Sequence, residues 1–303
     1  MTTRLNTRSR GFSLMELMVA MAITTIIVTI LVSITSIATD TWNRSRSELR
    51  AMRQGKAMVD AISKDFEAMV ARRGNRFDWL VANADALSNE PSGFESAGKV
   101  DLTLFTAVTD RYDGQIGTAK DDGGDVSCVA YRLEYKDPIE ANGKFPSYVL
   151  TRVLVNPDET YKELLGKTGE GDPDDLADLF DSNFQTELDD PVNFVCENVY
   201  QFSLAFHVEV PVLSNGKITY ETKRFLISQN GESQKLILRG SGMEVEPPPG
   251  TDVVQQLKTG RLKAVEVSLT VISDLTADAA RAGNILPNRK KKLLAEQSYQ
   301  YSK

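Results

Sequence analysis

The chain is poor in the residues from which catalytic and metal sites are most often built. It has one histidine, His207, and two cysteines, Cys128 and Cys196, among 303 residues. A structural zinc site needs four closely spaced ligands, mostly Cys or His, so this composition argues against one. The Gly-x-Ser-x-Gly, His-Glu-x-x-His and phosphate-loop patterns are also missing. We therefore predict a protein that is not an enzyme and that has no obligatory cofactor.

Positive charge is also in short supply. Lys and Arg number 35 against 42 Asp and Glu, which gives a formal net charge of −7. Proteins that bind nucleic acid neutralise phosphates with Lys and Arg, so we expect no nucleic-acid partner. One strongly basic run, Arg289–Lys292, lies near the C-terminus. A charge run of this kind is usually a solvated face, and we interpret it so.

One apolar segment near the N-terminus carries no charge at all. It runs from Leu17 to Ile37, and as a helix it would span ~30 Å, the thickness of a bilayer core. Three arginines, Arg4, Arg8 and Arg10, precede it. The positive-inside rule then predicts a single transmembrane helix with its N-terminus in the cytoplasm and the rest of the chain outside.

Two ordinary interpretations of this segment compete. A cleavable secretory signal would use the small residues around Ser36–Ala38 as its cleavage site, but its apolar core is usually only ~7–15 residues long. A plain signal anchor explains the span and its orientation. Neither interpretation explains Glu16, which stands at the start of the span. An ionised carboxylate there costs on the order of 2.5–3.5 kcal/mol by insertion scales, so it needs a partner.

The residues just before the span supply such a partner if the chain is cut between Gly11 and Phe12. The new α-amino group of Phe12 and the carboxylate of Glu16 are then i and i+4 on one helix face. The amine neutralises the Glu16 of the same chain or of a neighbour. The stretch RGFSLMEL, residues 10–17, with the apolar residues that follow it, resembles the type IV prepilin signature.

This resemblance implies how the protein is processed and assembled. A prepilin peptidase removes the leader, residues 1–11, and methylates the amine of Phe12. Glu16 then directs docking with other minor and major pilins or pseudopilins through the N-terminal helix, at an assembly platform in the bacterial inner membrane. The globular part would be periplasmic, and the subunit would enter a periplasmic or surface filament.

The span continues into a one-sided helical pattern. Apolar residues recur at steps of three and four: Leu49, Met52, Gly55, Val59, Ile62, Phe66, Met69 and Val70. Charges fill the other faces: Arg50, Arg53, Lys56, Asp60, Lys64, Asp65 and Glu67. Gly74 follows two arginines and suits a helix end. We predict one helix over residues 12–73, ~93 Å long, that packs one face of its second half on a sheet.

The remainder has the period and composition of strands. Gly, Pro, Asn and Asp separate the β-rich runs Val100–Ala107, Val126–Tyr135, Tyr148–Val155, Val199–Val210, Phe225–Ile227 and Leu262–Ile272. The acidic stretch Asp172–Phe184 predicts a short surface helix. The fold class expected is α+β, type IV pilin-like, with one long helix on antiparallel sheet. Its parts are a leader (1–11), a transmembrane helix (12–38), an amphipathic helix (39–73) and a β-rich domain (74–303).

The order of the strands resembles the J-type minor pseudopilin of type II secretion systems. The resemblance rests on four short segments: VAYRL at 129–133, YVLTR at 148–152, ENVYQF at 197–202 and AVEVSL at 264–269. In that family they are a strand pair with a trailing Arg, a strand after a turn, and a late strand. The resemblance implies a minor subunit at the filament tip that helps to start assembly. The long acidic stretch 156–191 and the basic tail depart from the pattern.

Alternatives remain open at several residues. Cys128 and Cys196 both fall in predicted strands and are either a disulfide or two buried free thiols. Asp121, Asp122 and Asp125 form a Gly-rich loop that is either a solvated turn or a weak calcium site without EF-hand spacing.

Other functions also remain open. The protein is either the assembly subunit described above, a minor type IV pilin or other prepilin-like protein that binds a ligand, or, least well supported, an anchored periplasmic enzyme. His207 is read as a surface or edge residue of a strand.

Overall fold

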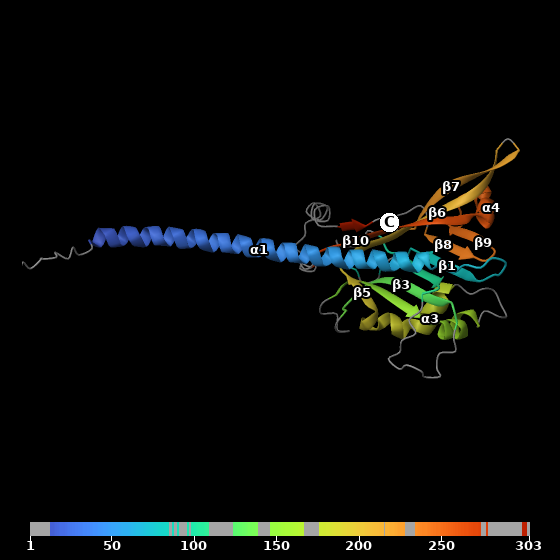
Figure 1. Ribbon diagram of the computed structural model, residues 1–303, viewed down its shortest axis with the longest axis horizontal. Coiled ribbons are helices and arrows are strands. Elements are labelled where there is room, and N and C mark those ends of the chain that lie inside the picture. The colour runs from blue at the N-terminus through green and yellow to red at the C-terminus, as the bar shows by residue number, and fades with distance from the viewer. Residues whose placement is uncertain are drawn as a thin grey trace, which may run out of the picture. The chain divides into compact units, whose positions relative to one another are not determined.

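The computed structural model describes residues 13–84, 87, 90, 96, 98–108, 124–138, 146–166, 176–214, 216–227, 234–273, 277 and 299–301. The chain forms two compact units, Met1–Ser47 and Glu48–Lys303. The described residues of the first unit form a helical stretch from Leu14 on, and the second unit contains two antiparallel sheets, as Figure 1 shows. The α+β, type IV pilin-like fold class expected from the sequence is confirmed.

Helix α1 runs from Leu14 to Glu67 and belongs to both units. In its first part the hydroxyls of Thr24, Thr25 and Thr29 donate to carbonyls four residues earlier, each at 2.8 Å. These bonds satisfy the polar groups inside an apolar stretch. Among the described residues, α1 is one helix that is long and apolar enough to cross a membrane.

The helix ends at Glu67, earlier than the predicted Arg73. The chain then becomes extended and pairs with the last residues of the strand Asp101–Thr106. Met69 pairs with Thr106, and the amide of Val70 donates to the carbonyl of Phe105 at 2.8 Å. Met69 packs on one side of the sheet and Val70 on the other. The last two apolar residues assigned to the helical stripe are therefore alternating strand residues.

The larger sheet has seven strands in the order β5-β4-β3-β2-β1-β8-β9, with antiparallel neighbours. Their bounds are β1 Asp78–Asn83, β2 Asp101–Thr106, β3 Ser127–Lys136, β4 Ser147–Val155, β5 Phe194–Glu197, β8 Lys235–Arg239 and β9 Gly242–Glu246. The smaller sheet has the order β11-β10-β6-β7, with β6 Val199–Ser214, β7 Lys217–Ile227, β10 Arg261–Val271 and β11 Tyr299–Tyr301.

The main core lies where the two sheets and the second half of α1 meet. Met58, Val59 and Ile62 of α1 are buried there, and Ile62 is fully buried, beside Leu104 of β2 and Phe206 of β6. Both sheets contribute inward residues. Of the helix stripe predicted from Leu49 onward, Gly55, Val59 and Ile62 are buried, whereas Leu49 and Met52 are exposed. Burial of this kind is the main stabilising term for a helix that has little tertiary support elsewhere.

A second core covers the opposite face of the seven-stranded sheet. Helix α3, Leu176–Asp189, buries Leu176, Phe180, Phe184 and Leu188 against it. The prediction of a helix in the acidic stretch is thus right in kind, but the helix is not confined to the surface. Its residues Asp178, Glu187 and Asp189 are exposed, and the buried side chains four residues apart form an apolar stripe. The other short helices are α2 Pro157–Glu159, η1 Thr160–Leu165, η2 Pro191–Asn193 and α4 Thr251–Thr259.

Candidate assembly site

The described chain begins with a reciprocal hydrogen-bonded cap at the start of α1. The amide of Ser13 donates to Glu16 Oε2 at 3.0 Å, and the amide of Glu16 donates to Ser13 Oγ at 3.2 Å. This is a capping box: Ser13 stands at the N-cap and Glu16 three residues later, so each side chain satisfies an amide that the helix leaves unpaired. Both residues are exposed.

The cap gives the Glu16 carboxylate a defined place. It lies in the first turn of the helix, where the amide dipoles favour negative charge. Sequence reasoning treated Glu16 only as a partner for an amine and missed its bond to Ser13. The Ser-x-x-Glu spacing was the signal that could have found it. Gly11 and Phe12, the two sides of the predicted cut, lie outside the described residues.

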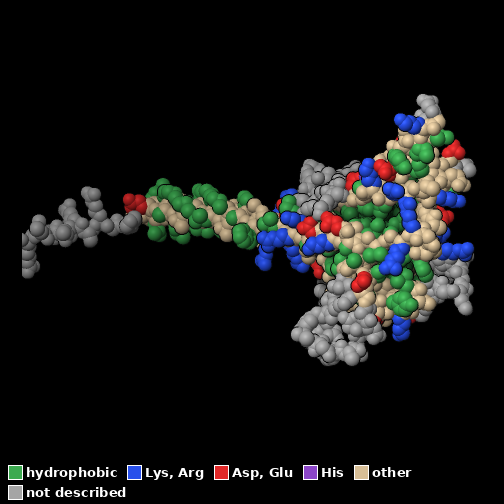
Figure 2. All heavy atoms as spheres, turned by 45° about the vertical axis from the view of Figure 1, so that its right-hand side comes forward, with side chains coloured by type: hydrophobic (Ala, Val, Ile, Leu, Met, Phe, Trp, Pro, Cys, Tyr) green, Lys and Arg blue, Asp and Glu red, His purple; other side chains and the backbone are tan. Residues whose placement is uncertain are grey.

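The surface of α1 next to this cap is apolar on every side. Large hydrophobic residues there are more than half exposed: Leu14, Met15, Leu17, Met18, Val19, Met21, Ile23, Ile26, Ile27, Val28, Ile30, Leu31, Val32, Ile34 and Ile37. Figure 2 shows hydrophobic side chains along this whole stretch of helix. Exposure of an apolar surface of this size to water is unfavourable, so we expect lipid or other helices to cover it.

At the other end of α1 a buried ion pair ties the helix to the larger sheet. Asp65 has 2% of its side chain exposed, and its two carboxylate oxygens accept from Arg152 Nη2 at 2.8 Å and Nε at 2.9 Å. The hydroxyl of Tyr131 donates to the same carboxylate. Tyr131 and Arg152 are register partners on β3 and β4. A bidentate pair with a third donor fixes the rotation of the helix on the sheet.

The pKa values of the two partner side chains follow from this burial. Loss of water raises the pKa of the Tyr131 hydroxyl, and the negative charge of Asp65 raises it further. Burial alone would lower the pKa of Arg152, but its hydrogen bonds and charge interactions with Asp65 and Tyr131 together raise it. The sequence placed Asp65 among the charges of the solvated faces, and this was wrong. Its position facing Arg152 needed the strand register, which a helical period does not contain.

The two cysteines are free and buried, which is one of the two alternatives that the sequence left open. Cys128 on β3 is opposite Val155 of β4, and Cys196 on β5 is opposite Leu150 of the same strand. β4 therefore lies between the two cysteines, and neighbouring strands are ~4.8 Å apart. The two thiols also belong to the cores on opposite faces of the sheet. This geometry does not suit a disulfide.

The remaining predicted site residues form no metal site within the described part of the chain. Asp125 is exposed, while Asp121 and Asp122 lie outside the described residues. His207 is in β6 with its Nε2 3.6 Å from Glu266 Oε2, and its side chain is 31% exposed. Within the described ranges, no group of three His, Cys, Asp or Glu residues is placed to hold a metal ion. The basic run 289–292 is likewise outside the described part of the chain.

Comparison with known proteins identifies the N-terminal segment. Residues 6–32 match the family model of the prokaryotic N-terminal methylation motif, which covers the capping box and most of the apolar stretch. This match supports a type IV prepilin-like protein, of the pilin or pseudopilin type, that a prepilin peptidase processes. Proteins of this kind with a pilin fold are generally structural. Searches of curated proteins and of solved structures each found no match.

Proposed function

We propose that this protein is a minor pseudopilin: a structural subunit of a pilus-like filament of a type II secretion system or a related machine. The observation that carries the proposal is Glu16, held by a capping box at the start of an exposed apolar helix inside the methylation motif. A capping box alone would also suit a plain membrane anchor, so the match of residues 6–32 to the methylation motif is what favours a filament subunit. A carboxylate in that place is useful where helices of several subunits must meet in register.

The assembly step follows from what the cut does to the charges. Before it, Glu16 is satisfied by the amide of Ser13. Cleavage after Gly11 creates an ammonium on Phe12, one helical turn from Glu16. Entry into the filament places the amine of an incoming subunit beside the Glu16 of a neighbour, and an ion pair out of water is worth more than one in water. Charge matching therefore sets the depth at which the incoming helix docks.

The size of the globular unit supports a minor rather than a repeating subunit. Two sheets and a second core against α3 make it larger than a helix with one sheet. The segments that resemble a J-type subunit lie in the neighbouring strands β3 and β4, at the end of β5 and the start of β6, and in β10. We propose that the unit lies in the periplasm, at the filament tip, and that the helix is anchored in the inner membrane. The partners are the prepilin peptidase, other pseudopilins and the assembly platform.

The proposal is tested by filament incorporation. Filaments sheared from cells that carry an epitope on this subunit are probed for it, in wild type and in Glu16→Ala. We expect the tag at far below one copy per major subunit, and its loss from the filaments in Glu16→Ala while the membrane level is unchanged. Glu67→Ala, at the far end of the same helix, is the matched control and should be incorporated normally. Equal incorporation of both variants would remove the role given to Glu16.

A further inference from the structure

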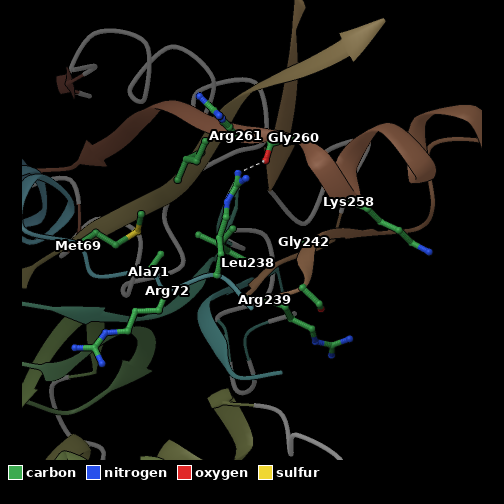
Figure 3. A pocket seen from close by; sticks show the side chains of 13 residues that line it. Met69, Ala71, Arg72, Leu238, Arg239, Gly242, Lys258, Gly260 and Arg261 are labelled. Carbon is green, nitrogen blue, oxygen red and sulfur yellow. Dashed lines mark hydrogen bonds between the residues drawn. The ribbon is translucent and has the colours of Figure 1, made fainter. Parts of the chain in front are cut away.

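The larger unit contains a hollow next to the C-terminal end of α1 that the assembly role does not use. Its volume is about 340 Å³. Three separate segments form its walls: residues 69–73 after α1, the turn between β8 and β9, and the junction of α4 with β10. Figure 3 shows the side chains of these segments arranged around it.

The lining of the hollow is basic and contains no acidic residue. Its five cations are Arg72, Arg73, Arg239, Lys258 and Arg261. In a chain with a net charge of −7 this is an unusual concentration of positive charge. Like charges held around one hollow repel one another, so anionic groups bound beside them lower the energy of the whole group.

Among the described residues, acidic neighbours neutralise one of these cations, Arg239. Arg239 donates to Asp78 Oδ1 at 2.6 Å and to Glu244 Oε2 at 2.8 Å. Arg73 instead donates to the carbonyl of Gly260 at 3.1 Å, which leaves its charge uncompensated.

The other three cations have no carboxylate partner among the residues that the structure describes. Arg72, Lys258 and Arg261 are exposed, and each lacks an ion pair in the described part of the chain. Glu209 of the neighbouring strand β6 is the register partner of Arg261. Its carboxylate Oε1 lies 3.6 Å from Lys263 Nζ instead. The hollow therefore has a surplus of positive charge available to a ligand.

Close backbone contacts hold two walls of the hollow together. Gly242 has φ +141, and a Cβ there would lie 2.7 Å from the Cα of Lys258. Only glycine allows the β8–β9 turn to approach the end of α4 this closely. The hollow is thus a built feature of the fold, whose walls do not depend on the loose ends of side chains.

The arrangement of the charges indicates the kind of anion. In Figure 3 the heads of Arg72, Lys258 and Arg261 lie on different sides of the hollow and point away from its centre. A single phosphate would require heads that converge on one point. The aliphatic side chains of Met69, Leu238 and Leu262 also line the hollow. Anionic groups spaced along an extended chain, with apolar atoms between them, match this surface.

We propose that this hollow binds an acidic peptide segment of a partner protein, with carboxylates at Arg72, Lys258 and Arg261 and aliphatic contact to the floor. Arginine suits this role because its planar guanidinium takes a carboxylate with two parallel hydrogen bonds. A short peptide meets mainly the local charge, whereas a long nucleic acid would also meet the repulsion of an acidic protein. The lining also contains no aromatic side chain on which a base could stack. The inference does not depend on the assembly role of Glu16.

The test uses the full chain in detergent micelles and a fluorescein-labelled peptide of alternating glutamate and alanine, with fluorescence anisotropy as the readout. We expect saturable binding that weakens with salt, and no binding of the matching glutamine–alanine peptide. The triple variant Arg72→Gln, Lys258→Gln, Arg261→Gln should weaken binding at least about tenfold. A control triple changes the same net charge outside the hollow and should weaken it less than about twofold: Lys56→Gln, Lys162→Gln and Lys217→Gln.

The three substituted side chains of the hollow are exposed, so both triple variants are expected to fold, which circular dichroism checks. Equal weakening by the two triples would mean a diffuse charge effect and would overturn the proposal. Tighter binding of an oligothymidylate than of the peptide would replace it with nucleic-acid binding. Absence of binding to the wild-type chain would also reject it.

Discussion

The capping box predicts that Ser13 stabilises the first turn of α1. Ser13→Ala removes the acceptor for the Glu16 amide and should cost about 1 kcal/mol of local helix stability, while Ser13→Thr keeps the acceptor. We expect amide hydrogen exchange at residues 14–17 to accelerate several-fold in the Ala variant of the uncut chain in micelles. Unchanged exchange in Ser13→Ala would show that the cap does not stabilise the helix start.

The buried Asp65 carboxylate supports a second prediction for a single residue. Asp65→Asn leaves the charge of Arg152 half-buried without its counter-ion, and we expect a loss of about 3 kcal/mol in unfolding free energy. Tyr131→Phe removes one hydrogen bond to the same group and should cost about 1–2 kcal/mol. Urea unfolding followed by the fluorescence of the buried Trp79 gives both values. A double variant Asp65→Asn, Arg152→Met that costs less than Asp65→Asn alone would establish the pair as one coupled unit.

Opposite pH dependences are expected from two aspartates. Burial raises the pKa of Asp101, although Arg132 and Lys99 oppose this, while a hydrogen bond from Gln185 lowers that of Asp189. A raised carboxyl pKa means that the folded state binds the extra proton, so stability from Asp101 falls as pH rises above ~3.9. Stability from Asp189 instead falls as pH drops below ~3.9.

The measurement is the unfolding free energy from pH 3 to pH 7 for Asp101→Asn and Asp189→Asn. Relative to wild type, Asp101→Asn should gain stability with rising pH and Asp189→Asn should lose it. The same sign of change in both variants would contradict the burial assigned to Asp101.

At the scale of elements, the sequence predicted those whose pattern is local. The runs at 126–135, 148–155 and 262–272 are β3, β4 and β10 within a residue or two, because their alternation or β-rich composition extends over most of the strand. β7 begins at Lys217, well before the predicted Phe225, since its first part is exposed on both faces and lacks apolar alternation. β1, β8 and β9 were not predicted. They are short, and their place in the sheet depends on partners far away in the chain.

The capping residues and the apolar span of the candidate site can be recognised in the sequence for the same reason, because they lie within one helical stretch. The Asp65–Arg152 pair could not be predicted from the sequence, because it joins residues 87 positions apart. The hollow at the end of α1 was missed as well. It takes walls from three segments that only the folded sheet brings together.

Helix α3 gives a prediction for an element that the sequence placed at the surface. Phe180 is fully buried against the sheet, so Phe180→Ala should cost about 3–5 kcal/mol of stability. Thr186→Ala, on the exposed side of the same helix, should change stability by less than ~0.5 kcal/mol. Thermal unfolding of the full chain compares the two. A cost for Phe180→Ala as small as that for Thr186→Ala would contradict the burial of α3 against the sheet.

The whole molecule combines an exposed apolar helix with a sheet-rich unit that contains no disulfide among its described cysteines. Burial raises the pKa of Cys196 to about 12 and that of Cys128 further, so neither thiol ionises at neutral pH. We expect iodoacetamide to leave the native chain unmodified and to add two groups after denaturation without reductant. Mass spectrometry counts the groups. No addition in the denatured chain would mean a disulfide.

The central claim is that this chain is a prepilin whose Phe12 becomes the methylated first residue of a filament subunit. The intact mass of the protein from its native membrane tests it most directly. We predict a chain that starts at Phe12 and carries one added methyl group. A chain that starts at Met1 or Thr2 would mean a plain signal anchor, and one that starts at Thr39 would mean an exported protein. Either result would contradict the account.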